Sequence, residues 1–193
     1  AVAAFRASLT ESMVCTTVRG MPVFRPAQCS HAYARAHTTI PLSPTALFEK
    51  LLTLDFAAVL DQRISKIECV ARLDDCTDVL HVQYNPFFPV AARDAVLVRR
   101  AMFSGGSGYI VVASVDPEGN TIPIPKGCVR ATINASGYHI AISPRGIGTD
   151  ITYVVNAAVT GWLPTTLLKF INTTPQLVVG PLMRLHEFCT SLA

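Results

Sequence analysis

The stretch ARDAVLVRRAMFSGGSGYIVVASV, residues 92–115, contains two strand-forming runs joined by a glycine-rich turn. Ala92–Phe103 and Tyr109–Val115 are rich in valine and other β-formers, and the turn between them is Ser104–Gly108. A short connection of this kind joins neighbouring antiparallel strands. The stretch therefore predicts a β-hairpin.

Similar runs, each ending at a turn signal, lie on both sides of this hairpin. They are Met13–Val18, His31–Ile40, Ile64–Leu73, Thr77–Tyr84, Cys128–Ile133, Tyr138–Ile142 and Ile151–Val159. One helix is expected from Ser43-Pro44, a serine cap followed by proline, to about Leu60. Gly20-Met21-Pro22 predicts a turn. The short connections favour an antiparallel, meandering sheet, so the fold class is expected to be α+β.

The last part of the chain predicts a long apolar helix. Apolar residues recur there at three- and four-residue spacing: Leu163, Leu167, Phe170, Ile171, Val178, Leu182, Leu185, Phe188 and Leu192. Pro175 and Pro181 are expected to bend or interrupt this helix. Residues 151–168 carry no charge over the length of a membrane span, but Asn156 and Pro164 among them favour a strand, a turn and then a helix.

The composition indicates a globular domain with a surplus of apolar residues. Of 193 residues, 50% are hydrophobic and 15% are charged, whereas a charged share of about 25% is typical. We expect a single domain over residues 1–193, with residues 1–12 as a candidate peripheral N-terminal segment. The chain does not begin with Met, so we interpret it as a domain of a longer protein. The surplus apolar side chains must lie in a large core, in a membrane or along a cavity.

Signals of catalysis, metal binding and nucleic-acid binding are scarce. Sixteen basic residues against 13 acidic ones give a net charge of +3. The basic residues form no cluster of the kind that binds the phosphate backbone of a nucleic acid. The six cysteines have no zinc-binding spacing, so no metal or cofactor is expected and the thiols are expected to be reduced. Gly105–Tyr109 resembles a nucleophile elbow without its last glycine. No catalytic residue is predicted, and the chain is not expected to be an enzyme.

One arginine falls within an apolar strand face. Alternation places Arg93, Ala95, Leu97 and Arg99 on one face, and Asp94, Val96, Val98 and Arg100 on the other. An unpaired buried charge costs several kcal/mol, so Arg99 needs an anionic or strongly accepting partner. Two interpretations remain open at this point: a structural ion pair or exposed strand end, and a ligand head group or water cluster inside a cavity.

Several short strings occur together in the order and with the spacing found in one family. They are Phe88-Pro89, Arg93–Arg99, Ser114-Val115, Val129-Arg130-Ala131, Ser136-Gly137 and Gly161-Trp162-Leu163-Pro164. With them the chain resembles the START family, the lipid-transfer domains related to the steroidogenic acute regulatory protein. The resemblance runs from about Met13 to the end of the chain. It implies a helix-grip fold, a curved antiparallel sheet wrapped around a long C-terminal helix, with an internal hydrophobic tunnel that accounts for the apolar surplus.

The resemblance also implies candidate ligand-binding residues. Arg99 corresponds to an arginine that faces the cavity beside a glutamate in sterol-binding relatives, and Gln83 stands at the glutamate position. Arg99 is therefore expected to lack a charge partner, which favours an anionic ligand or a water-mediated contact. Ala57 and Val82 replace residues that hold choline in the phosphatidylcholine-binding branch. The full candidate set is Arg99, Gln83, Asp61, Leu97, Tyr84, Trp162, Leu167, Phe170 and Ile171.

The function implied by the resemblance is binding of a single phospholipid or sterol in the cavity and its transfer between membranes. The partners expected are the lipid and, transiently, a membrane surface, contacted by the C-terminal helix and the loop of residues 120–126. We expect a monomer in the cytoplasm, peripheral to membranes. Two alternatives are a lipid-sensing module that regulates a larger protein, and a hydrolase or cyclase on the same scaffold. For the enzyme, Asp61 and His81 are the candidate acid–base pair.

Overall fold

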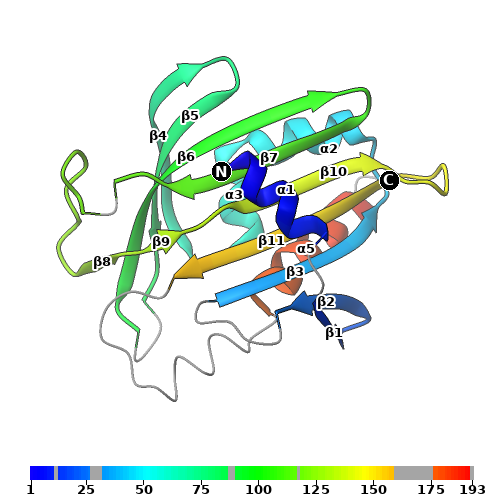
Figure 1. Cartoon of the computed structure of the whole chain (residues 1–193), viewed down its shortest axis with the longest axis horizontal. Helices are drawn as coiled ribbons and strands as arrows, with labels where there is room; N and C mark the ends of the chain where they lie inside the picture. Colours follow the sequence, from blue (N-terminus) through cyan, green and yellow to red (C-terminus); the bar gives the residue numbers. More distant parts are fainter. Residues whose placement is uncertain (11–12, 27–31, 87–89, 117, 159–175, 192–193) are drawn as a thin grey trace.

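The computed structural model describes residues 1–10, 13–26, 32–86, 90–116, 118–158 and 176–191, and its main element is one curved sheet (Figure 1). The strands are β1 (Val14–Val18), β2 (Met21–Arg25), β3 (Ala32–Ile40), β4 (Ile64–Asp74), β5 (Thr77–Tyr84), β6 (Ala92–Ser104), β7 (Ser107–Ser114), β8 (Cys128–Arg130), β9 (Thr132–Ile133), β10 (Ser136–Ile142) and β11 (Thr149–Ala158). The hairpin predicted from residues 92–115 is confirmed as β6 and β7.

The strands do not follow a simple meander. Their order is β1-β2-β3-β11-β10-β7-β6-β5-β4, with β8 beside β6 and β9 beside β11. Strand β3 pairs with β11 along its whole length, so an early segment and a late one are neighbours within the sheet. Within the described residues, every pair is antiparallel except that of β6 with β8. The predicted antiparallel meander is therefore wrong in the strand order and in the one parallel pair. Sequence periodicity carries no information on which distant strands meet.

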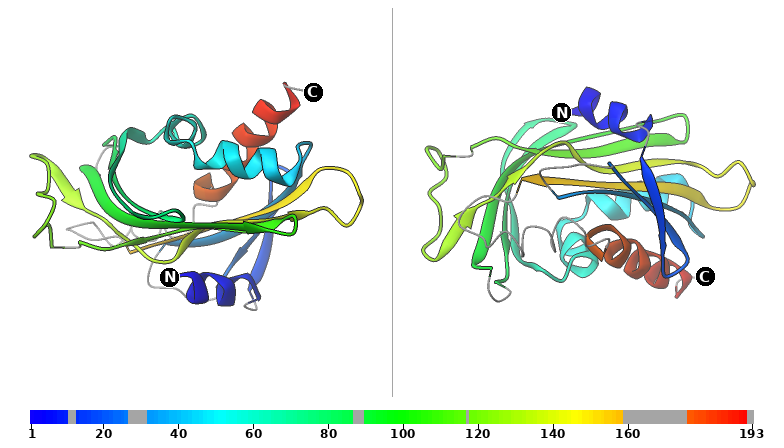
Figure 2. Two further views of the ribbon diagram at one scale, coloured as in Figure 1. Left: turned by 90° about the horizontal axis from the view of Figure 1, so that it is seen from above. Right: turned by 60° about the horizontal axis from the view of Figure 1, so that its bottom comes forward.

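Among the described residues, four helices lie against the two faces of the sheet. They are α1 (Val2–Thr10), α2 (Pro44–Leu52), α3 (Leu54–Leu60) and α5 (Gln176–Thr190). Figure 2 shows α2, α3 and α5 on the concave face and α1 on the convex face. The arrangement confirms the α+β, helix-grip fold class, with a C-terminal helix packed against a long antiparallel sheet.

The helix predicted between Ser43 and Leu60 is two helices. Its start is as expected, because the Ser43 hydroxyl accepts a hydrogen bond from the Ala46 backbone N–H at 3.3 Å and Pro44 occupies the first turn. Thr53 then adopts an extended conformation and separates α2 from α3. The Thr53 hydroxyl donates to the carbonyl oxygen of Lys50 at 2.7 Å, which satisfies the end of α2.

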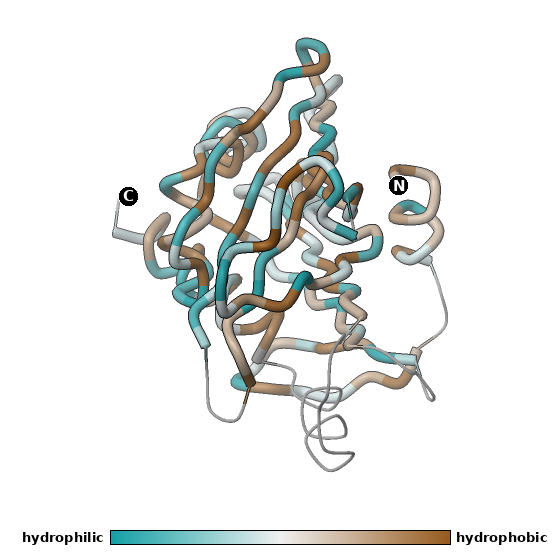
Figure 3. The backbone as a smooth tube through the Cα atoms, turned by 90° about the vertical axis from the view of Figure 1, so that its left-hand side faces the viewer, coloured by the Kyte–Doolittle hydropathy of each residue, from teal (hydrophilic) through white to brown (hydrophobic). Residues whose placement is uncertain are grey.

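The main core lies between α5 and the concave face. Val178, Val179, Leu182 and Leu185 of α5 are all completely or almost completely buried there. Along the strands, hydrophobic and hydrophilic residues are interspersed, as expected of a sheet with two different faces (Figure 3). Pro181 lies inside α5, which continues through it, so the interruption considered at this residue does not occur. The earlier part of the predicted terminal helix lies outside the described residues.

The N-terminal helix covers the convex face. Phe5 of α1 is completely buried and packs with Tyr33, Val111 and Val154, which come from three strands. The Arg35 guanidinium donates a hydrogen bond to the carbonyl oxygen of Ser8 at 2.6 Å, near the C-terminal end of α1. Residues 2–10 of the segment expected to be peripheral thus pack on the sheet.

In the parts of the chain that the structure describes, no helix combines the length and the hydropathy that crossing a bilayer requires. The uncharged run that begins at residue 151 starts within β11.

Candidate ligand-binding cavity

A cavity of about 270 Å³ lies between the concave face of the sheet and the beginning of α5. Most of its described lining is apolar, and β6, β7 and β11 contribute Leu97, Ile110 and Val155, respectively. Leu177 contributes from α5. A largely apolar cavity with a few polar groups is typical of a small-molecule site, although this volume lies just below the usual range of about 300–1,000 Å³.

Polar residues gather where α3 ends, β4 begins, β5 ends and β6 begins. We call this group the polar end; it comprises Asp61, Arg63, Tyr84, Asn85 and Arg93, all of which line the cavity. Backbone pairing holds the group together: Tyr84 lies in register with Arg93, and the Asn85 N–H donates to the carbonyl oxygen of Arg63 at 2.7 Å. Four chain segments are thus fixed against one another by the sheet.

Asp61 and Arg63 form a two-pronged ion pair in the polar end. Arg63 Nε donates to Asp61 Oδ1 at 2.8 Å, and Arg63 Nη2 donates to Asp61 Oδ2 at 2.7 Å. Burial alone lowers the pKa of Arg63, but the hydrogen bonds and charge of Asp61 outweigh it and raise this pKa. Both partners of the ion pair are therefore charged, and their opposite charges sum to zero.

Three tyrosines present protonated hydroxyl groups in this region. Burial, followed by the charge of Asp61, raises the pKa of Tyr84, and the same two causes raise the pKa of Tyr153 to about 12. Burial and the neighbouring Tyr153 raise the pKa of Tyr138. The rings of Tyr138 and Tyr153 stack with their centroids 4.5 Å apart. All three groups can donate a hydrogen bond at neutral pH, but they are poorly suited to act as bases.

A glycine allows β10 to approach β7 closely beside the cavity. Gly137 has a φ of 141°, and a Cβ atom there would lie 1.9 Å from the carbonyl oxygen of Ile110. No other residue fits at this position without a shift of the backbone. Gly137 itself lines the cavity, one position before Tyr138. The glycine therefore helps to place the tyrosine.

The structure brings some of the predicted ligand-binding residues together and separates others. Asp61, Tyr84 and Leu97 line the cavity. Gln83 lies on the other face of β5 from Tyr84, because side chains alternate along a strand. Four predicted residues lie outside the described residues: Trp162, Leu167, Phe170 and Ile171.

The expectation that Arg99 lacks a charge partner is wrong. Arg99 Nη2 lies 2.6 Å from Asp78 Oδ2, and Arg99 Nε donates to Asp78 Oδ1 at 3.0 Å. Its Nη1 donates to the carbonyl oxygen of Leu52 at the end of α2. Arg99 borders a second, smaller pocket of about 160 Å³ and is not among the described residues of the main cavity. Gln83, which the resemblance places beside Arg99, lies in backbone register with Asp94 instead.

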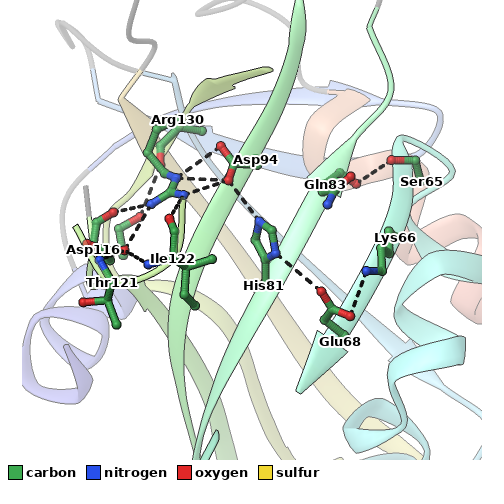
Figure 4. A network of polar contacts seen from close by, with 12 residues as sticks. Ser65, Lys66, Glu68, His81, Gln83, Asp94, Asp116, Thr121, Ile122 and Arg130 are labelled. Atoms are coloured by element: carbon green, nitrogen blue, oxygen red, sulfur yellow. Dashed lines mark hydrogen bonds and ion pairs between the residues drawn. The ribbon is translucent and has the colours of Figure 1, made fainter. Parts of the chain in front are cut away.

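A buried polar network lies on the convex face (Figure 4). Asp94, which is 0% exposed, accepts hydrogen bonds from Arg130 Nε and Nη2 at 3.1 and 2.9 Å. His81 Nε2 lies 3.0 Å from Asp94 Oδ2, and its Nδ1 lies 3.5 Å from Glu68 Oε1. His81 thus belongs to a network that does not include Asp61, so the acid–base pair considered for an enzyme is not formed.

Arg130 connects this network to the segment that contains the 120–126 loop. Its guanidinium donates to the carbonyl oxygens of Asp116 and Ile122, the latter at 2.9 Å. The Asp116 carboxylate accepts the backbone N–H groups of Asn120, Thr121 and Ile122 at 2.9, 3.1 and 2.7 Å. The ordered loop exposes Ile124 and Lys126 to solvent.

Five residues in or around the polar end were not predicted: Arg63, Asn85, Arg93, Tyr138 and Tyr153. Arg93 could have been predicted from the sequence, because strand alternation places it on the same face as Leu97. The two tyrosines carried no comparable signal, since their meeting depends on the pairing of β10 with β11. No group of three or more potential metal ligands occurs among the residues that the structure describes.

Comparison with solved structures reveals the same fold in other proteins, among them human STARD10 and human StAR-related lipid transfer protein 5. Human STARD10 superposes with a TM-score of 0.81 at 20% identity, over 98% of this chain and 78% of that one. Human StAR-related lipid transfer protein 5 gives a TM-score of 0.82 at 13% identity, over 98% and 95% of the two chains. The Zhui aromatase/cyclase from Streptomyces is a more distant match, with a TM-score of 0.56 at 8% identity over 82% and 93%.

No curated protein sequence matches the chain. The sequence profile of the START domain, by contrast, matches residues 10–178, which is most of the chain. The match includes the strings that carried the resemblance, and its fold agrees with the observed sheet and terminal helix. The chain therefore belongs to the START domain family.

Proposed function

We propose that this START domain binds one lipid in its cavity and transfers it between membranes. The observation that carries the proposal is the cavity itself, which is apolar along the sheet and polar where Asp61, Arg63 and Tyr84 meet. A lipid has the same division between its tail and its head. Removing a hydrocarbon chain from water stabilises the complex by about 0.8 kcal/mol for each buried CH₂ group.

Membrane contact is proposed for the C-terminal helix and the 120–126 loop. Support for the loop comes from its exposed side chains, with Ile124 able to enter an interface and Lys126 able to approach anionic head groups. We propose that the protein acts as a monomer in the cytoplasm, peripheral to membranes. All described cysteines are free thiols, which agrees with a reducing compartment.

The experiment that tests the proposal is transfer of fluorescent lipids between donor and acceptor liposomes. Val155 lines the cavity, so Val155→Trp should fill it and abolish transfer of every lipid that the wild type carries. Val79→Trp is the matched control, because Val79 lies on the convex side of β5 and outside the cavity. Equal transfer by the wild type and Val155→Trp would show that lipid does not travel in this cavity.

The membrane contact has a separate test in liposome sedimentation. Ile124→Asp should lower binding to vesicles containing phosphatidylserine, because a charge replaces an apolar side chain at the interface. Leu73→Asp is the control, since Leu73 is an equally apolar residue, 62% exposed, at the β4–β5 hairpin. A similar loss for both variants would count against a specific role of the loop.

A further inference from the structure

The charges that line the cavity do not balance. Among its described lining residues, only Asp61, Arg63 and Arg93 carry a formal charge at neutral pH. The two-pronged pair of Asp61 with Arg63 cancels within itself. Arg93 has neither a hydrogen bond nor an ion pair from its guanidinium to any residue that the structure describes. The polar end therefore has a net charge of about +1, and that charge belongs to Arg93.

The position of Arg93 directs this charge to the cavity. Arg93 stands near the start of β6 on the same strand face as Leu97, and both line the cavity. It lies in register with Tyr84 on one side and with Val129 of β8 on the other. Burial lowers the pKa of Arg93, and no acceptor raises it again. An arginine remains protonated in such a place. Arg93 is therefore a partly dehydrated cation that has no partner among the described residues.

Two other arginines of the sheet, Arg99 and Arg130, are differently placed. Arg99 is bound to Asp78 and to the carbonyl oxygen of Leu52, outside the cavity. Arg130 is bound to Asp94 on the convex face. Each of these two is matched by a carboxylate from a neighbouring strand or segment. In contrast to these two, Arg93 has no carboxylate partner among the residues that the structure describes.

We propose that Arg93 binds the negatively charged head group, a phosphate or a carboxylate, of the amphiphile held in the cavity. The inference rests on the proposed function and narrows its ligand to the anionic class. The planar guanidinium matches the paired oxygens of either group. Tyr84, directly opposite Arg93, supplies a protonated hydroxyl that has no hydrogen-bond partner among the described residues and completes the site as a second donor.

Three single-chain probes with the same tail test the proposal: dodecanol, dodecanoate and dodecyl phosphate. Their affinities for the purified protein are measured by calorimetry below the concentrations at which they form micelles. We expect one or both anions to bind more tightly than the alcohol, and Arg93→Gln to reduce anion binding at least roughly tenfold, the effect of losing one charge-assisted hydrogen bond. Dodecanol binding should not change in Arg93→Gln.

Two further variants test whether the effect depends on the positive charge at position 93 or only on the net charge of the protein. Arg93→Lys keeps the positive charge and should recover part of the anion affinity. Arg145→Gln removes an exposed arginine far along the chain, in the β10–β11 turn, and should have no effect. The two anions report which head group the site prefers: stronger loss for dodecyl phosphate identifies a phosphate site, and stronger loss for dodecanoate identifies a carboxylate site.

Two results would overturn the inference. Equal affinity of the wild type for the alcohol and both anions would show that the cavity does not select charge. An unchanged anion affinity in Arg93→Gln would show that another residue provides the selection. In either case bound dodecanol would leave the proposed function standing, whereas failure of all three probes to bind would contradict the cavity's function together with the role of Arg93.

Discussion

Arg99 and Asp78 face each other across neighbouring strands and form an ion pair with two contacts, at 2.6 and 3.0 Å. Both side chains are mostly buried, with exposed fractions of 14% for Arg99 and 9% for Asp78. The third contact of Arg99, to the Leu52 carbonyl oxygen, joins the pair to the end of α2. Arg99, which the sequence analysis names as a candidate ligand-binding residue, thus connects α2 to the sheet.

The first prediction follows from this pair. Arg99→Leu should lower the free energy of unfolding by about 3–5 kcal/mol, because it leaves the Asp78 carboxylate buried without a partner. The double variant Asp78→Leu with Arg99→Leu should recover much of that loss, since no isolated charge remains. Urea denaturation measures both values. Stability equal to that of the wild type, combined with lost lipid binding, would restore Arg99 as a ligand residue.

The second prediction concerns acid. The pKa of Asp116 is lowered, most strongly by the hydrogen bond from the Ile122 N–H. The N–H groups of Thr121 and Asn120 and the charge of Arg130 lower it further, and together these effects outweigh burial, which raises it. A carboxylate with a lowered folded-state pKa stabilises the fold above its unfolded value of 3.8, and this contribution disappears as the pH falls through the folded-state value. Thermal unfolding at decreasing pH should therefore show a smaller acid-induced loss for Asp116→Asn than for the wild type. Parallel curves for the two proteins would show that Asp116 does not contribute.

The third prediction concerns alkali. Burial and Asp61 raise the pKa of Tyr153 to about 12 from its usual 10.0. The unfolded chain loses the proton first, so this contribution to stability is complete below pH 10.0 and is lost as the pH rises toward 12. Tyr153→Phe should therefore lose less stability than the wild type over that range. Absorbance of tyrosinate tests the same point, and ionisation of every tyrosine near pH 10.0 would contradict it.

The fourth prediction concerns the N-terminal helix. Phe5 is completely buried on the convex face, so Phe5→Ala should lower the free energy of unfolding by about 3–5 kcal/mol. Val59→Ala, at a site that is 53% exposed, should change it by less than about 0.5 kcal/mol. Chemical denaturation of both variants distinguishes a helix that is part of the domain from one that merely lies beside it. Equal, small effects would indicate the latter.

The sequence predicted most of the secondary structure because the strand signals are local. Thr77–Tyr84 was predicted with the bounds of β5, and the neighbouring runs were correct to within a few residues. Errors occurred where local signals compete: Met21 and Pro22 read as a turn, but they begin β2, and the turn is formed by the preceding Arg19 and Gly20.

The site was harder to predict than the fold because it depends on the pairing of distant strands. Alternation correctly placed Arg93 and Arg99 on one face. It could not show that Asp78 lies opposite Arg99, since that depends on the register of β5 against β6. For the same reason Tyr138 and Tyr153 were missed, although each lies in a predicted strand.

The most direct test of the central claim, a lipid held in the cavity, is native mass spectrometry of the purified protein followed by solvent extraction of its ligand. The account predicts a one-to-one adduct whose extracted molecule is an amphiphile with a phosphate or a carboxylate, and its loss in Val155→Trp but not in Val79→Trp. A sterol would support the cavity and contradict the role of Arg93. A protein that is empty as purified and takes up no lipid from liposomes would contradict the account as a whole.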